Sequence, residues 1–229
     1  MHTKVPLFGP IHLAILASVV LLGLVSAWMV RRKPVIGRPL RWVFAIVSSI
    51  LGLSWYLLRY TVLHSPLRWD LPLEVCDLAL WITVAALIYP RQRLLELAYY
   101  WGLTGASMAL VTPYLTAPLT SLSSLTFFAG HGMIVASVIF LLGTGRMRPS
   151  PGSWRFALLV LNGIALVDFC VDRWLGTNYM YLLRKPPIAS LLSIMGPWPW
   201  YILAADALAA ALFLGLQWPF RRADVSRPY

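Results

Sequence analysis

The feature that most constrains this chain is a series of apolar segments separated by short polar loops. A helix needs about 20 mostly apolar residues to cross the roughly 30 Å hydrocarbon core of a bilayer. The segments that meet or approach this length are Ile11–Val30, Trp42–Tyr60, Leu73–Tyr89, Leu94–Val111, Leu125–Gly143, Trp154–Leu175 and Trp198–Trp218. The pattern predicts an all-α, polytopic membrane protein with seven transmembrane helices in a single integral membrane domain, residues 1–229.

The composition favours a membrane protein over a nucleic-acid-binding one. Hydrophobic residues make up 59% of the chain and charged residues only 12%, whereas soluble domains carry about 25% charged residues. The net charge of +11 comes from Lys and Arg in short loops, which form no basic stripe interleaved with exposed aromatic residues. We therefore expect membrane phospholipids as partners and no nucleic acid.

The positive charges predict the orientation in the membrane. Loops on one side hold thirteen cations: Arg31, Arg32, Lys33, Arg38, Arg41, Arg91, Arg93, Arg146, Arg148, Arg155, Arg221, Arg222 and Arg227. Loops on the other side hold six: Lys4, Arg59, Arg68, Arg173, Arg184 and Lys185. Because cytoplasmic loops are enriched in Lys and Arg, we expect the N-terminus outside and the C-terminus inside a cell membrane.

Ionisable residues within the predicted spans fall mostly at one depth. With this orientation, three groups lie in the outer half of the bilayer: Glu74, Cys76 and Asp77 at the start of the third span, His131 in the fifth, and Asp168, Cys170 and Asp172 late in the sixth. Asp206 falls nearer the midplane and Glu96 near the cytoplasmic side. Such residues are costly in a membrane and often functional, so the pattern predicts a polar chamber in the outer leaflet half.

Within this chamber, Cys76 and His131 are the candidate catalytic pair. An imidazole near a thiol can accept its proton and later return one to a leaving group, so the pair can carry an acyl group as a thioester. Glu74, Asp77, Asp168 and Asp206 are candidate supporting residues. Alternatively, Cys76 is a packing residue or forms a disulfide with Cys170, and the acids only brace helices.

The loop before the last predicted span adds a candidate lipid site. Asn178, Tyr179, Arg184 and Lys185 follow the sixth span on the predicted outer side. A guanidinium can bind phosphate through two parallel hydrogen bonds. We expect these residues to hold a phospholipid headgroup, although the two cations are equally explained as ordinary interfacial residues.

Two further functions remain open from the residues alone. A non-catalytic lipid or small-molecule carrier would use the same chamber, with Asp206 and Glu96 for proton coupling. A b-type haem protein would use His12 and His131, which both lie in the predicted outer half. The sequence contains no G-x-S-x-G, H-E-x-x-H, P-loop or Rossmann motif, and its four histidines are scattered. We expect no cofactor and no metal.

Several motifs, in order from about Trp42 to Phe220, resemble a known family. They are Leu71-Pro-Leu-Glu-Val-Cys-Asp77, Glu96-Leu-Ala-Tyr-Tyr-Trp-Gly102, Phe127-Phe-Ala-Gly-His-Gly132, Gly176-Thr-Asn-Tyr-Met-Tyr181 and Gly196-Pro-Trp-Pro-Trp-Tyr201. The chain resembles the bacterial YwaF-type integral membrane proteins, which are grouped with animal transmembrane protein 164, an acyltransferase acting on ether phospholipids through a cysteine.

The resemblance implies roles for two residues. It implies a Cys nucleophile in the L-P-L-x-x-C motif, here Cys76, and a His in the G-H-G motif, here His131. The chain also resembles, more distantly, membrane lipid hydrolases that use a Thr and a His. Many relatives have His where this chain has Glu74, which puts a proton relay through that position in doubt. The expected function is a membrane-embedded phospholipid acyltransferase or lipid hydrolase.

Overall fold

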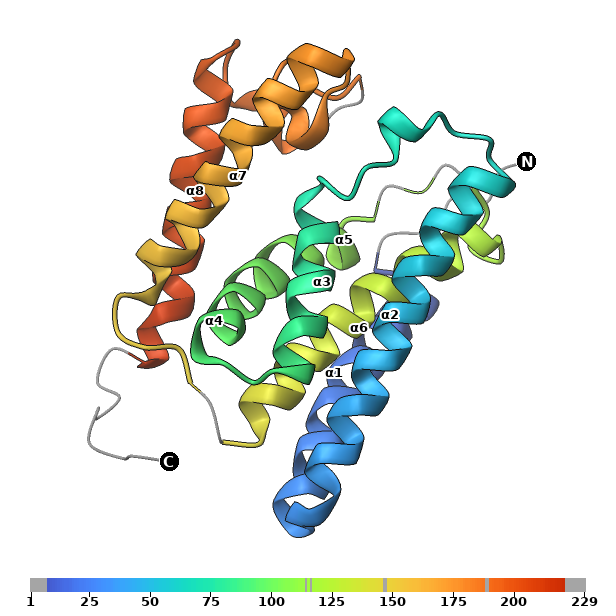
Figure 1. The fold of residues 1–229 in the computed structure, drawn as a ribbon, viewed down its shortest axis with the longest axis vertical. Helices are drawn as coiled ribbons and strands as arrows, with labels where there is room; N and C mark the ends of the chain where they lie inside the picture. Colours follow the sequence, from blue (N-terminus) through green and yellow to red (C-terminus); the bar gives the residue numbers. More distant parts are fainter. Residues whose placement is uncertain (1–7, 114, 116, 146–147, 188–189, 221–229) are drawn as a thin grey trace.

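The computed structural model describes residues 8–113, 115, 117–145, 148–187 and 190–220, and this part of the chain is helical without strands (Figure 1). The main helices are α1 (Pro10–Arg32), α2 (Gly37–Thr61), α3 (Val75–Ile88), α4 (Gln92–Trp101), α5 (Ser107–Val111), α6 (Leu122–Gly143), α7 (Ser153–Leu175) and α8 (Trp200–Gln217). A π-helical segment, η3 (Gly102–Ala106), joins α4 to α5. Short 3-10 turns are η1 (Pro34–Ile36), η2 (Leu67–Trp69), η4 (Tyr179–Tyr181), η5 (Leu191–Ile194) and η6 (Trp218–Phe220). The predicted all-α fold is confirmed.

Five described helices are long and apolar enough to cross a membrane. They are α1, α2 with the turn before it, α6, α7, and α8 with the turn after it, and they correspond to the first, second, fifth, sixth and seventh predicted spans. The third predicted span is α3, whose 14 residues cover roughly 21 Å at about 1.5 Å per residue. The fourth predicted span is formed by α4, η3 and α5, which follow one another without a gap and change from α-helix to π-helix and back. The count of seven spans stays a prediction.

The orientation also stays a prediction, although the path of the chain agrees with it. Consecutive long helices run in opposite directions, so alternate loops lie at opposite ends of the molecule (Figure 1). Five of the cations on which the orientation was predicted lie outside the described residues: Lys4, Arg146, Arg221, Arg222 and Arg227.

Helix α1 packs closely along α6, and small residues make this approach possible. A Cβ atom added at Gly132 would lie 2.8 Å from Val19 Cγ2, and one at Gly143 would lie 2.6 Å from Ala27 Cβ. Both distances are shorter than real carbon contacts. Since lipid tails are as apolar as side chains, helices in membranes associate through such close packing of small residues.

Helices α7 and α8 form a hairpin that packs against itself and against α4. In Figure 1 the two helices lie side by side at one edge of the bundle, and α1 lies at the opposite edge. At the midpoint of the hairpin, Asn162 Nδ2 donates to Asp206 Oδ1 at 2.8 Å. The predicted supporting residue Asp206 therefore joins α7 to α8.

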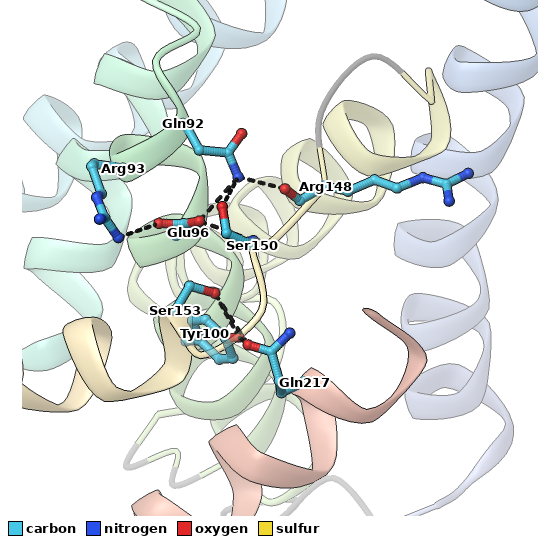
Figure 2. Close-up of polar contacts among 8 residues, drawn as sticks. All are labelled: Gln92, Arg93, Glu96, Tyr100, Arg148, Ser150, Ser153 and Gln217. Atoms are coloured by element: carbon cyan, nitrogen blue, oxygen red, sulfur yellow. Dashed lines mark hydrogen bonds and ion pairs between the residues drawn. The ribbon is translucent and has the colours of Figure 1, made fainter. Parts of the chain in front are cut away.

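One end of the hairpin is fixed to α4 by a buried polar cluster around Glu96 (Figure 2). The Glu96 carboxylate is fully buried. It accepts hydrogen bonds from Gln92 Nε2 at 3.0 Å and from the Ser150 backbone N–H at 3.0 Å, and it forms an ion pair with Arg93 at 3.1 Å. Because Ser150 lies just before α7, this carboxylate positions the start of that helix.

A second set of contacts beside Glu96 reaches the end of α8 (Figure 2). The buried Tyr100 hydroxyl donates to Gln217 Oε1 at 2.8 Å and lies 3.0 Å from Ser153 Oγ. On the neighbouring residue, the Tyr99 hydroxyl donates to the Leu216 carbonyl at 2.9 Å. Helix α4 therefore holds both the first turn of α7 and the last turn of α8.

Candidate functional site

Tyr179 connects the loop after α7 to the loop before α3, at the end of the molecule opposite to Glu96. Its side chain is only 4% exposed. The hydroxyl donates to the Arg68 carbonyl at 2.7 Å and accepts from the Leu71 backbone N–H at 3.0 Å. Burial raises the pKa of Tyr179, while the hydrogen bond from Leu71 acts to lower it. The hydroxyl is thus protonated near neutral pH and able to donate.

Asp172 fixes the backbone that carries Tyr179. Its Oδ1 atom accepts from Thr177 Oγ1 at 2.7 Å and from the Tyr179 N–H at 2.8 Å. Helix α7 ends at Leu175, and the next residue, Gly176, has a left-handed φ of 69°, which suits a residue without a side chain. These contacts fold the loop back over the start of α3.

Asn178, which is predicted to bind a headgroup, organises its own loop. Its Oδ1 atom accepts from the Leu183 N–H at 2.9 Å and the Arg184 N–H at 3.1 Å, and its Nδ2 atom donates to the Arg184 carbonyl at 2.8 Å. The amide is thus occupied on both sides. We interpret Asn178 as a residue that positions Arg184.

A pocket of about 300 Å³ lies where these two loops meet. Its described lining combines charged and aromatic side chains from α2, from the start of α3 and from the loop after α7: Trp55, Tyr56, Arg59, Trp69, Asp70, Leu71, Glu74, Asp77, Asn178, Tyr179, Tyr181, Arg184, Lys185 and Pro187. Six of the predicted site residues are therefore brought together. Cys76, His131, Asp168 and Asp206 are not among the described lining residues.

Sequence reasoning missed the α2 side of this pocket. Arg59 Nε forms an ion pair with Asp70 Oδ1, and Arg59 Nη2 donates to the Trp69 carbonyl at 3.2 Å. Ser65 Oγ also donates to Asp70 Oδ1, at 3.0 Å. The spacing of Arg59 and Asp70 across a short loop was the available signal, but an ion pair across a loop is too common to indicate a pocket.

Cys76 lies in the first turn of α3 and is half-buried. In the sequence it stands between two acidic residues, Glu74 and Asp77. Glu74 precedes α3, and its Oε2 atom accepts from the Met180 N–H at 3.3 Å, so the loop after α7 contacts the residue two positions from the thiol. Both Cys76 and Cys170 are free thiols, and Cys170 is exposed. The structure thus contains no disulfide between them.

His131 is a half-buried residue of α6, and its ring has a defined tautomer. Its Nδ1 atom is 2.8 Å from the Phe127 carbonyl oxygen. A carbonyl oxygen only accepts, so Nδ1 carries the proton and Nε2 of the neutral ring has the free lone pair. The Phe127 ring also packs on the imidazole, with the centroids 4.3 Å apart. His131 is thus arranged to accept a proton at Nε2.

The π segment η3 packs against the α6 face that carries His131. A Cβ atom added at Gly102 would lie 3.0 Å from Ile134 Cγ2 and 3.2 Å from Val138 Cγ2. His131 precedes Val138 by seven residues, nearly two full turns, so the two share one face of α6. π-helical turns of this kind are frequent at functional sites.

The same segment reaches the start of α3. A Cβ atom added at Gly105 would lie 3.7 Å from Cγ1 of Val75, the residue before Cys76. Helix α3 also contacts α6 directly. Both candidate catalytic residues therefore belong to stretches beside η3, although no hydrogen bond joins them in the described part of the chain. That their side chains share one cavity stays a prediction.

Asp168 is fully buried in α7, and neither of its carboxylate oxygens has a hydrogen-bond partner among the described residues. It lies one turn before Asp172, whose Oδ2 atom also lacks a partner there. Across the described residues, no group of three or more His, Cys, Asp or Glu side chains is arranged to hold a metal ion.

The geometry of His12 counts against its use as a haem ligand. This residue is fully buried, and both ring nitrogens are engaged: Nδ1 accepts from the Phe8 N–H at 3.0 Å, and Nε2 donates to the Leu110 carbonyl at 2.8 Å. A haem iron would require one of these nitrogens. The contacts instead anchor the start of α1 to the end of α5.

Comparisons with known proteins identify the family. No curated protein and no solved structure matches the chain significantly. A family model, described as the TMEM164 family, matches residues 7–217, which is most of the chain and includes every candidate site residue. The expected grouping with transmembrane protein 164 is thereby confirmed. This chain is a membrane protein that belongs to the TMEM164 family.

Proposed function

We propose that the chain is a membrane-embedded phospholipid acyltransferase in which Cys76 carries the acyl group as a thioester and His131 moves the proton. The observation that carries the proposal is the tautomer of His131. Because Nδ1 donates to the Phe127 carbonyl, the lone pair is on Nε2, on the α6 face that packs against η3. The start of α3, with Cys76, packs against the same segment.

The proposed reaction has two balanced halves. First, His131 Nε2 takes the Cys76 proton while the sulfur bonds to the acyl carbonyl carbon, and the ester C–O bond breaks. The leaving alcohol oxygen takes the proton from the imidazolium, which leaves a thioester. Second, an acceptor hydroxyl gives its proton to Nε2 and attacks the thioester. The C–S bond breaks, and the sulfur recovers the proton.

The acceptor decides between transfer and hydrolysis. With a second lipid hydroxyl as acceptor, the protein transfers the acyl group. With water as acceptor, the same thioester releases a free fatty acid. A site within apolar helices holds little water, which favours transfer. In this proposal the site lies in the outer leaflet half of the cell membrane, on the side that the distribution of cations predicts to be outside.

Glu74 has a structural rather than a relay role in this proposal. Its carboxylate accepts from the Met180 N–H, so it couples the loop after α7 to the start of α3. Asp77 stands one residue after the thiol and lines the pocket below that loop. Cys76 thus stands in the sequence between two residues that line the pocket, and His131 remains the base.

A carrier that couples transport to protons fits the structure less well. The two acids considered for this role are both engaged. Glu96 is enclosed by three donors, and Asp206 accepts from Asn162. A carboxylate that loads and releases a proton must become accessible, whereas these contacts brace helices.

Reconstitution with labelled phospholipid tests the proposal. We expect Cys76→Ser and His131→Ala each to abolish acyl transfer, and the double variant to be no worse than either one, because the residues act as a unit. Intact-protein mass spectrometry should find an acyl adduct that hydroxylamine removes, absent in Cys76→Ser. Cys170→Ser, which changes an exposed free thiol, is the matched control and should retain activity. Near-normal transfer by Cys76→Ser would refute the thioester.

A further inference from the structure

Three fully buried hydroxyl groups have no hydrogen-bond partner among the described residues. They belong to Ser48 on α2, Thr83 on α3 and Ser137 on α6. A serine or threonine inside a helix can donate to a backbone carbonyl of the preceding turn, as Ser54 on α2 and Thr126 on α6 do here. The three buried hydroxyls make no such bond, and burying a hydroxyl without a partner is costly. These groups are thus candidates to bind a small polar molecule.

A stacked aromatic pair places Ser48 and Ser137 at one level of the bundle. The ring of Phe44 on α2 stacks on that of Phe140 on α6, with the centroids 4.9 Å apart. Ser48 follows Phe44 by four residues, which is about 6 Å along α2. Ser137 precedes Phe140 by three residues, which is about 4.5 Å along α6. Because α2 and α6 run in opposite directions (Figure 1), both steps lead toward the end that holds the pocket, so the two hydroxyls lie at similar depth.

A close glycine contact places Thr83 at the same level. A Cβ atom added at Gly52 on α2 would lie 2.6 Å from Leu80 Cδ2, so α2 touches α3 there. Ser48 precedes Gly52 by four residues, which is again about 6 Å. Thr83 follows Leu80 by three residues, which is about 4.5 Å. Because α3 runs opposite to α2, both steps lead away from the pocket and end at similar depth.

The three side chains also point toward one another. On α2, Ser48 lies about 40° around the helix from the stacked ring and about 40° from the glycine on the other side, so it points between α6 and α3. On α6, Ser137 is turned about 60° from the stacked ring toward Ile134, which meets η3. On α3, Thr83 is turned about 60° from the glycine contact toward Val75, which also approaches η3. Since α2, α3 and α6 contact one another in pairs, the hydroxyls converge where these three helices meet.

We propose that an internal water molecule binds at this junction and is held by the hydroxyl groups of Ser48, Thr83 and Ser137. A buried water typically makes about three hydrogen bonds to polar groups that otherwise lack partners. No two of these hydroxyls bond to each other, and each can donate or accept. The water therefore links three helices through one shared partner. The site does not depend on the proposed catalysis, since Thr83 follows Cys76 by seven residues, roughly 10 Å.

A structure of the full chain in lipid, at a resolution that shows ordered water, tests the proposal directly. We expect one density peak within hydrogen-bond distance, about 2.5–3.0 Å, of all three hydroxyl oxygens. A peak bonded to fewer than three of the hydroxyls would overturn the proposal. So would hydroxyls that are turned toward carbonyl groups of their own helices, with no peak between them.

Double-mutant cycles followed by thermal unfolding test the link between helices. Ser48→Ala and Ser137→Ala remove hydroxyls that share the water, so the double variant should lose less melting temperature than the sum of the single variants, by about 2 °C or more. Ser54→Ala is the matched control, because its hydroxyl donates to the Leu51 carbonyl of its own helix, and it should combine additively with Ser137→Ala. If either site variant does not fold, Thr83→Val, which keeps the shape of the side chain, takes its place. Additive losses for the site pair would contradict a shared water.

Discussion

Tyr179→Phe should loosen the loop after α7 from the loop before α3, because one hydroxyl makes two of the three hydrogen bonds described between them, the third being that of the Met180 N–H to Glu74. The substitution removes only the oxygen that donates to the Arg68 carbonyl and accepts from the Leu71 N–H. The ring stays and remains buried. The effect thus reports the hydrogen bonds rather than the packing.

The expected loss of stability depends on whether water can replace the hydroxyl at each of its two partner groups. The Leu71 N–H is half-buried, so losing its acceptor costs more than an average hydrogen bond, whereas Arg68 is exposed and its carbonyl can bind water. Taking about 1–2 kcal/mol for the first and roughly 0.5–1 kcal/mol for the second gives about 1.5–3 kcal/mol. In a protein of this size, each kcal/mol lowers the melting temperature by about 2–4 °C. We expect a decrease of roughly 3–12 °C.

Thermal unfolding in detergent, followed by tryptophan fluorescence, measures this decrease. Tyr60→Phe is the matched control, since its ring is exposed near the end of α2 and makes no hydrogen bond in the described part of the chain. The control should melt like the unmodified protein. If Tyr179→Phe also melts unchanged, the hydroxyl does not hold the two loops together and the account of the pocket is wrong.

Three further predictions address the rest of the molecule. Reporter fusions at Arg148 and Leu119 should report cytoplasm and outside, respectively, and the reverse result would overturn the predicted orientation. Glu96→Ala should destabilise by about 2–3 kcal/mol because it leaves the half-buried donors of Gln92 and Ser150 without this acceptor, whereas Glu96→Gln keeps an acceptor and should lose less. Chemical denaturation compares the two variants, and equal losses would refute the donor argument. Gly132→Leu should separate α1 from α6, because a Cβ atom already meets Val19 at 2.8 Å; cross-linking between engineered cysteines on the two helices should fail in this variant, and an unchanged yield would contradict the packing.

Hydropathy was sufficient to predict most of the helices but not their irregularities. The segments that become α1, α2, α6, α7 and α8 are long and apolar, so burial in lipid alone determines them. The π segment at Gly102 leaves no trace in hydropathy, because it arises from close packing on Ile134 and Val138. Such contacts depend on a helix that lies far away in the sequence.

The sequence was sufficient to predict how deep the candidate site residues lie in the membrane, but not toward which side of each helix they point. Positions along each helix placed Glu74 and Asp77 near the loop that carries Arg184, and the pocket brings these residues together. Rotation about a helix axis cannot be derived from depth, so the relation of Cys76 to His131 was beyond reach. The loop contacts of Asn178 could not be predicted for another reason. Its amide bonds to backbone groups a few residues away, and no residue pattern distinguishes such contacts from a ligand contact.

The pairing of α1 with α6 has a consequence for the order of assembly during synthesis. Helix α6 begins 90 residues after α1 ends. At a translation rate of about 5–20 residues per second, α1 stays in the bilayer for roughly 5–18 s before its partner has been made. During that time the face of α1 that packs on α6, which includes Val19 and Ala27, lies against lipid or another protein. A chaperone or insertase that shields this surface would therefore act on the nascent chain between the emergence of these two helices.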